Sequence, residues 1–293
     1  MRAVVDIETD AINATKIHCI VARSKETGQA RHWIGDECHN FREWSKKIDT
    51  FIMHNGISFD APLLNKFTGS DIKIDQIDDT LIKSQLYNPI RDGGHSLESW
   101  GNFFNHKKGD YHDFSHFNEE MLKYCYTDTA VTMETYDYLQ EEGKKFSEES
   151  YDLERKVRSI VDKQQSNGFA FDLMKGMTLE AKLMDELYSL EEKAHDMFPP
   201  TIVELKTKTK EIPFNIASRK QIAERLMEKG WKPKKKTDKG NVIVNEAVLD
   251  TIDMPEAKMF SRYFLLQKRT GLLKAWIQAC SEHERVHGRV LTL

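Results

Sequence analysis

The chain has 293 residues, of which 31% are charged and 39% hydrophobic, and its formal net charge is -4. This length accommodates two domains or one large one, and no apolar run is long enough for a membrane span or a signal peptide. The four cysteines include no C-x-x-C pair, which argues against a zinc site or a disulfide framework and favours the cytoplasm. The acidic balance excludes a uniformly basic protein that coats nucleic acid.

The charge is divided unevenly along the chain. Residues 1–150 carry 17 lysines and arginines against 26 acids, whereas residues 151–293 carry 26 against 21. The first part mixes strand-like and helix-like patterns, and the second consists mostly of helical periodicity. We therefore predict two domains, 1–147 and 148–293, with the boundary in the polar run 141–150.

Apolar and alternating segments of the first domain predict an α/β fold with a mixed central sheet. Three strands come first, followed by a helix, a fourth strand, a short helix and a long amphipathic helix. This order is typical of α/β proteins in which neighbouring strands pair before the chain crosses over. The predicted bounds in chain order are 3–7, 16–22, 31–34, 41–47, 50–53, 61–67 and 118–139.

The second domain is predicted to be mainly helical. The dipeptide Asn167-Gly168 marks the exit of its first helix, because glycine readily takes the left-handed conformation that ends helices. Ser218 and Gln221 predict a capping box at the start of its third helix. The predicted helices cover residues 151–165, 179–198, 218–230 and 256–284.

The first strand carries two candidate functional residues, Asp6 and Glu8. Side chains alternate along a strand with period two, so these two carboxylates point to the same side. Taken alone, an Asp-x-Glu pair at a strand end is more often a pair of solvated acids than a functional site, because short motifs recur freely.

Two further motifs supply acids. Asp60 follows another apolar strand at the start of a predicted helix, where it either caps the helix or ligates a metal through water, or does both. In the long helix, the i, i+4 spacing places the Tyr124 hydroxyl and the Asp128 carboxylate on one face. A Tyr and an Asp at that spacing also occur often by chance.

Taken together, D-x-E after the first strand, N-x4-D after a later strand and Y-x3-D on a late helix resemble the ordered signature of the DEDDy 3'-5' exonucleases. The resemblance implies a ribonuclease H-like fold and phosphodiester hydrolysis with two divalent metal ions, Mg2+ or Mn2+. Asp6 would bridge both metals, and Glu8 and Asp128 would hold the water-activating one. Asp60 would act on the second metal largely through its waters, and Tyr124 would position the attacking water.

The resemblance extends over nearly the whole chain to family A DNA polymerases, most closely to the replicative polymerases of short-tailed phages. The first domain is similar to their proofreading exonuclease, in which Thr9 and Asn55 match positions that contact the terminal nucleotide. The second is similar to the thumb region and its base. Matching phrases in chain order are Asp79-Thr80-Leu81, His95 to Gly101, Asn167 to Asp172, Gly230-Trp231 and Gln267 to Gly271.

The matching phrases end before those expected of the palm and fingers. The resemblance therefore implies a proofreading exonuclease that acts on single-stranded 3' ends in DNA replication, in the cytoplasm of an infected cell, without DNA synthesis by this chain alone. Either the chain is a truncated piece, or the palm and fingers lie on another polypeptide. The alternative hypothesis is a structural or DNA-binding subunit that docks such a polymerase chain. An RNA-directed exonuclease of the same superfamily is a third hypothesis.

A lysine-rich stretch in the second domain is the predicted phosphate contact. Residues 232–240 contain five lysines, and Lys234, Lys235 and Lys236 are the candidates, because such clusters follow phosphates without reading bases. A solvated loop explains the same pattern equally well. Between Phe198 and Phe214 the chain has only a short link, where some phage polymerases carry an inserted thioredoxin-binding loop. We therefore predict no thioredoxin partner.

Overall fold

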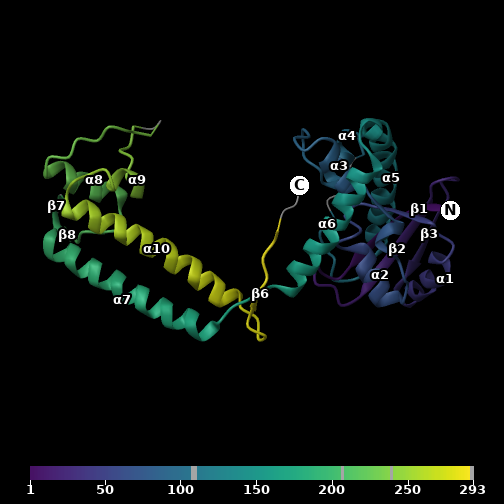
Figure 1. Ribbon diagram of the computed structural model, residues 1–293, viewed down its shortest axis with the longest axis horizontal. Coiled ribbons are helices and arrows are strands. Elements are labelled where there is room, and N and C mark those ends of the chain that lie inside the picture. The colour runs from purple at the N-terminus through teal and green to yellow at the C-terminus, as the bar shows by residue number, and fades with distance from the viewer. Residues whose placement is uncertain (107–110, 206–207, 238–239, 291–293) are drawn as a thin grey trace. The chain divides into compact units, whose positions relative to one another are not determined.

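The computed structural model describes residues 1–106, 111–205, 208–237 and 240–290 of the chain. It divides into two compact units (Figure 1). The first comprises Met1–Ser166 together with Arg289 and Val290, and the second comprises Asn167–Gly288. Within the described residues, no helix is long and apolar enough to cross a membrane.

A mixed five-stranded sheet forms the centre of the first unit. Its strand order is β3-β2-β1-β4-β5. Strand β1 pairs antiparallel with β2 and parallel with β4, while β2–β3 is antiparallel and β4–β5 parallel, so the predicted mixed sheet is confirmed. The sequence did not reveal β5, because three residues are too few for a periodic signal. The strands are β1 (Arg2–Thr9), β2 (Ile17–Ser24), β3 (Ala30–Ile34), β4 (Thr50–Met53) and β5 (Ile77–Asp79).

Helices cover both faces of this sheet. One face, which includes Val5 and Ile7 of β1, packs against α1 and α2 in the largest core cluster of the unit. The long helix α5 contacts β1 and β2 on the other face, where Cys19 and Val21 pack against Met121 and Cys125. The helices are α1 (Phe41–Ser45), α2 (Asp60–Thr68), α3 (Thr80–Tyr87), α4 (Leu97–Phe103), α5 (Glu119–Glu142) and α6 (Glu148–Asn167).

Helix α6 packs as part of the first unit. Tyr151 is buried in the core that Phe51 and Ile77 share with it, and Arg155 donates to the carbonyls of Ile74 and Asp75. The compact units divide after Ser166, whereas the sequence places the domain boundary at 147/148, in front of this helix. The run 141–150 looks like a linker because it is polar. The packing of Tyr151 that follows it is a contact with distant residues, which a local sequence pattern does not reveal.

The second unit is built on two long antiparallel helices, which confirms its mainly helical character. Helix α7 (Leu173–Met197) packs against α10 (Pro255–Ala279), and the shorter helices α8 (Arg219–Glu228) and α9 (Glu246–Leu249) complete a core around Phe260. Strand β6 (Phe169–Ala170) pairs antiparallel with β9 (Arg285–Val286).

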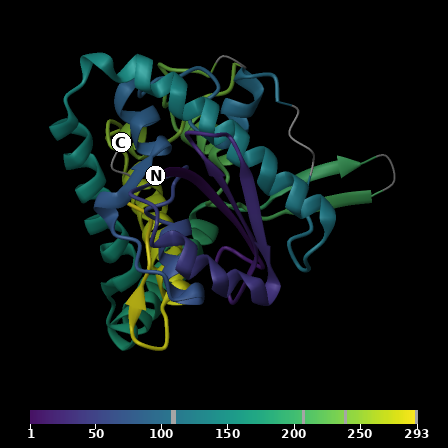
Figure 2. The ribbon, with the colours of Figure 1, turned by 90° about the vertical axis from the view of Figure 1, so that its right-hand side faces the viewer.

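One feature of this unit was not predicted, and one local expectation is only partly met. The link between Phe198 and Phe214 contains an antiparallel hairpin of β7 (Thr201–Leu205) and β8 (Lys208–Ile212), seen as the paired green arrows of Figure 2. The capping box of α8 is only half formed. Ser218 Oγ accepts from the Gln221 N–H, but Gln221 Oε1 accepts from the N–H of Asn215 at 2.7 Å and not from that of Ser218.

Candidate active site

Strand β1 directs Asp6 and Glu8 toward helix α5. Val4, on the same side of the strand, packs against Tyr136 of α5, and the side-chain alternation of a strand places Asp6 and Glu8 on that side too. Glu8 is buried and Asp6 is half-buried. The two acids of the predicted D-x-E pair are therefore enclosed next to a helix. They are not the solvated acids of a strand end that the alternative interpretation expected.

Helix α5 brings Asp128 and Cys125 to the same place. Asp128 is 6% exposed and Cys125 is fully buried. The Cys125 thiol donates a hydrogen bond to Asp6 Oδ2 at 3.2 Å, and the ligand atoms of Asp6, Glu8 and Cys125 all lie within 4.8 Å of one another. Cys125 was not among the predicted site residues. Its i, i+3 spacing from Asp128, which puts both on one helix face, is the sequence signal that could have identified it.

Asp60 is the first residue of α2 and does not cap it. The N-cap position is Phe59, and no side chain caps this helix end. The capping interpretation of Asp60 is therefore wrong. The Asp60 carboxyl instead lies close to the backbone N–H groups of Asp60 itself and of Ile7, the neighbour of Asp6 in β1, and both oppose the rise in its pKa that burial causes. This contact joins the start of α2 to the strand that carries the first two acids.

The four acids lie within electrostatic reach of one another. Burial, and then the negative charges of Glu8, Asp128 and Asp60, raise the pKa of Asp6 well above its usual range. Burial and the charges of Asp79 and Asp128 raise the pKa of Asp60 to about 7.

Ionising all these carboxyls without cations is unfavourable in such a site, because each loses hydration and repels the others. Divalent cations relieve both effects, and carboxylate oxygens are the ligands that Mg2+ and Mn2+ prefer. The donor set therefore fits a hard divalent metal. Asp6, Glu8, Asp60 and Asp128 are the residues that would hold it.

Tyr124 lies one helical turn from Asp128 within an aromatic cluster. Its ring centroid is 5.9 Å from that of Tyr111 and 6.3 Å from that of Phe114. The side chain is half-buried. The structure thus holds the Tyr124 ring by packing, on the helix that also supplies Asp128.

Thr9 is the last residue of β1, and Asn55 lies two residues after the end of β4. Thr9 is buried, and its hydroxyl donates to the Ala11 carbonyl at 2.9 Å. Asn55 has a positive φ of 64°, a left-handed conformation that Asn tolerates better than most residues. Its backbone N–H donates to Asp79 Oδ1 at 3.0 Å. Asp79, which in sequence stood out only as part of a matching phrase and not as a site residue, therefore lies near the acids.

The candidate lysines lie in the second unit. Lys234, Lys235 and Lys236 are exposed, in the segment where Lys236 bridges antiparallel to Val242. Lys239 falls outside the described residues. The three lysines therefore lie in the second unit, whereas the first unit contains the other seven predicted site residues, Asp6, Glu8, Thr9, Asn55, Asp60, Tyr124 and Asp128.

Comparison with known proteins relates the chain to phage polymerases. It is 24% identical over 419 aligned positions to the DNA-directed DNA polymerase of Escherichia phage T7, and the match covers 97% of this chain and 59% of the relative. The DNA-directed DNA polymerase of Enterobacteria phage T3 is likewise 24% identical, over 416 positions with the same coverage. No protein-family model matches. The chain thus spans about three fifths of the length of these relatives, and the aligned length shows that they contain residues without counterpart here.

The fold also resembles that of a polymerase domain. The POL domain of Pol1 from M. smegmatis, solved in complex with DNA primer-template and dNTP, superposes with a TM-score of 0.71 and 14% identity. That match covers 97% of this chain and 48% of the other. The relation to phage DNA polymerases predicted from the motifs is confirmed. The chain is thus similar in sequence to the T7 and T3 DNA-directed DNA polymerases and similar in fold to a polymerase domain.

Proposed function

We propose that this chain is a metal-dependent 3'-5' exodeoxyribonuclease that hydrolyses the terminal phosphodiester of single-stranded DNA. The observation that carries the proposal is the convergence of Asp6 and Glu8 from β1, Asp60 from α2 and Asp128 from α5. Three elements far apart in sequence place mutually repelling acids in one enclosed site. A fold tolerates such an arrangement most readily where cations join it, and phosphodiester hydrolysis is a reaction that a pair of divalent cations catalyses.

The residues then divide the work. Two divalent cations held by the four acids would supply the Lewis acidity that activates water and stabilises the leaving 3' oxygen. The Tyr124 hydroxyl would orient the attacking water. Asn55 and Thr9 would hold the terminal nucleotide, and Lys234, Lys235 and Lys236 would follow the phosphates of the strand.

The relatives suggest the biological setting. The T7 and T3 proteins are DNA-directed DNA polymerases, which supports a role in DNA replication in the cytoplasm of a phage-infected cell. In this setting the first unit, which includes α6, would proofread, and the helical second unit would act as a thumb-like region. A ribonuclease H-like assignment for the first domain and the lack of a thioredoxin partner stay predictions.

A docking role is the alternative function. On this hypothesis the chain, which matches only part of each relative, would bind a polymerase chain. A structural subunit of this kind would co-purify with a polymerase chain and would retain that interaction after its acids are removed.

The decisive experiment uses single-stranded DNA labelled at its 5' end, with Mg2+ or Mn2+. The wild-type chain should shorten the labelled strand stepwise from the 3' end. When the same strand is annealed to a template as a primer, a mismatched 3' terminus should be shortened faster than a matched one. The Asp6→Ala/Glu8→Ala double variant should not shorten it. As a matched control, Asp36→Ala/Glu37→Ala removes two exposed acids and should leave the rate unchanged.

Undiminished cleavage by the Asp6→Ala/Glu8→Ala variant would refute the proposal. Stepwise degradation of an RNA oligonucleotide in preference to DNA would replace the substrate class and favour the RNA-directed hypothesis.

A further inference from the structure

A buried carboxylate fastens the segment that carries Asn55 and leads to Asp60. Asp79, at the end of β5, is 1% exposed. Its Oδ1 accepts from the N–H of Asn55 at 3.0 Å, and its Oδ2 accepts from the N–H of Ile57 at 3.1 Å. Both donors belong to the loop 54–59 between β4 and α2. One side chain thereby fixes two backbone positions of a loop whose residue Asn55 has a left-handed conformation.

Helix capping explains only part of this arrangement. Asp79 is the N-cap of α3, and its Oδ1 also accepts from the N–H groups of Leu81 and Ile82, in the usual manner of a capping residue. The bonds from Asn55 and Ile57 lie outside the helix and add nothing to capping. A cap alone would be served equally well by a Ser or a Thr, which offer a single oxygen, whereas this position uses both oxygens of a carboxylate.

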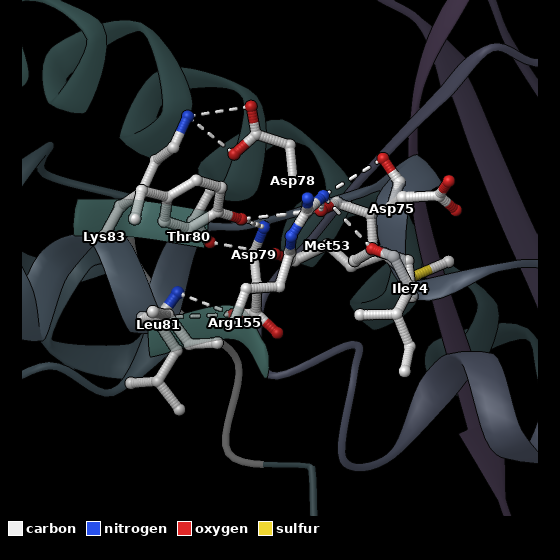
Figure 3. A network of polar contacts seen from close by, with 12 residues as sticks. Met53, Ile74, Asp75, Asp78, Asp79, Thr80, Leu81, Lys83 and Arg155 are labelled. Carbon is white, nitrogen blue, oxygen red and sulfur yellow. Dashed lines mark hydrogen bonds and ion pairs between the residues drawn. The ribbon is translucent and has the colours of Figure 1, made fainter. Parts of the chain in front are cut away.

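The next residue ties down the start of the same loop. The Thr80 hydroxyl contacts His54 Nδ1 at 2.9 Å and donates to the Met53 carbonyl at 3.2 Å. Figure 3 shows Asp79 and Thr80 side by side, with Met53 at the other end of the Thr80 bond. The pair Asp79-Thr80 therefore holds the loop from Met53 to Ile57.

Helix α6 supports this pair and the loop from outside the sheet. The Asp79 N–H donates to the Tyr151 hydroxyl oxygen at 2.6 Å, and that hydroxyl donates to the Ile77 carbonyl at 3.4 Å. Further along α6, Asp162 Oδ2 accepts from the Ser58 hydroxyl at 2.7 Å. Ser58 lies two residues before Asp60, so α6 contacts the loop directly as well as through Asp79.

Arg155 lies on α6 between Tyr151 and Asp162 and makes a third contact with the sheet end of the unit. Its guanidinium donates to the carbonyls of Ile74 and Asp75, which precede β5, as Figure 3 shows. Helix α6 is therefore held by the burial of Tyr151 and by the hydrogen bonds of Tyr151, Arg155 and Asp162. Along its length it supports the 54–59 loop and the segment before β5.

We infer that Asp79, Tyr151 and the Ser58–Asp162 pair are positioning residues, which hold the 54–59 loop so that Asn55 and Asp60 face Asp6. The inference rests on the proposed function. It also assigns helix α6 to the nuclease machinery, although its sequence reads as the beginning of the second domain. None of these residues needs to touch substrate, because each acts through the loop backbone or through Ser58.

Point variants in the full chain test the inference. Ser58→Ala and Asp162→Ala each remove one end of a hydrogen bond, and each should lower kcat/KM on single-stranded DNA about five- to tenfold, as expected for the loss of one such bond. The double variant should be no worse than the more damaging single one, because both changes break the same contact. Ser58→Thr, which keeps the hydroxyl, should restore the rate.

Hydrogen exchange gives a readout that does not depend on cleavage. In metal-free protein, peptides that contain residues 54–60 should exchange faster in Ser58→Ala and in Tyr151→Phe than in the wild type, while peptides from β1 and β2 should not. Asp79→Asn should produce the largest local change. Should that variant fail to fold, Ser58→Ala and Tyr151→Phe still decide the question.

Matched controls separate positioning from general destabilisation. Glu154→Gln removes a charge on α6, and Tyr188→Phe removes a hydroxyl from an exposed tyrosine of the second unit; neither should change kcat/KM or exchange in the loop. A wild-type chain that does not cleave DNA would refute the proposed function and the inference with it. A wild-type chain that cleaves, with Ser58→Ala, Asp162→Ala and Tyr151→Phe unchanged in both rate and loop exchange, would overturn the inference alone.

Discussion

The ion pair between Lys83 and Asp78 gives a sharp test of the packing beneath the candidate site. Lys83 Nζ lies 2.7 Å from Asp78 Oδ1, and the two side chains are 5% and 16% exposed. The ammonium group also lies 4.7 Å from the ring centroid of Tyr151 and 5.4 Å from that of Tyr136. The pair therefore joins β5 and α3 to two aromatic rings from α5 and α6, and Figure 3 shows it next to Asp79.

Replacing Lys83 by Met keeps an unbranched side chain and leaves the Asp78 carboxylate buried without its cation. Breaking a buried pair in this way costs about 3 to 5 kcal/mol of the free energy of unfolding. At about 2 to 4 °C for each kcal/mol in a domain of this size, the melting temperature of the first unit should fall by about 6 to 20 °C. In Lys83→Met/Asp78→Leu, both charges are gone and most of the loss should be recovered.

Urea unfolding followed by tryptophan fluorescence, together with scanning calorimetry, measures these differences. Lys73→Met is the matched control, because the Lys73–Asp71 pair is exposed and contributes little. The reasoning fails if Lys83→Met costs no more than Lys73→Met, or if the double variant is as unstable as Lys83→Met.

Three further predictions concern the site, the loop and the lysines. The pKa of Asp60 in metal-free protein is about 7, above its unfolded value of about 3.9, so its contribution to stability is present below pH 4 and is lost as the pH rises toward 7. Melting temperatures measured in EDTA should therefore fall between pH 4 and pH 7, and they should fall less in Asp60→Asn. Adding Mn2+ should reverse the fall. In Gly56→Ala the new Cβ would lie 2.2 Å from Met53 Cβ, so we expect a loss of about 1 to 3 kcal/mol in urea unfolding, together with slower cleavage, and an unchanged midpoint would contradict it. Replacing lysines 234, 235 and 236 by Ala should weaken single-stranded DNA binding and flatten the plot of log K against log salt by about 2 units of slope; a parallel plot would exclude them as phosphate contacts.

Local patterns in the sequence were enough to predict the elements that carry the candidate site. The alternation of Val4, Asp6 and Glu8 along an apolar strand requires the two acids to share a face, whatever the strand packs against. The 3.6-residue period of α5 likewise puts Tyr124 and Asp128 together. These are local properties of the chain, and the first four strands and most long helices were predicted for the same reason.

The surroundings of those residues depend on contacts between distant segments of the folded chain. The three residues of β5, the two bonds from Asp79 to the 54–59 loop and the contact of Cys125 with Asp6 join segments far apart in sequence, and no local pattern encodes them. The clearest case is helix α6, which packs with the first unit. The polar run 141–150 before it resembles a linker in sequence. Burial of the Tyr151 side chain and its hydrogen bond to Asp79 nevertheless stabilise the packing of α6 against the sheet, and both depend on residues far away in sequence.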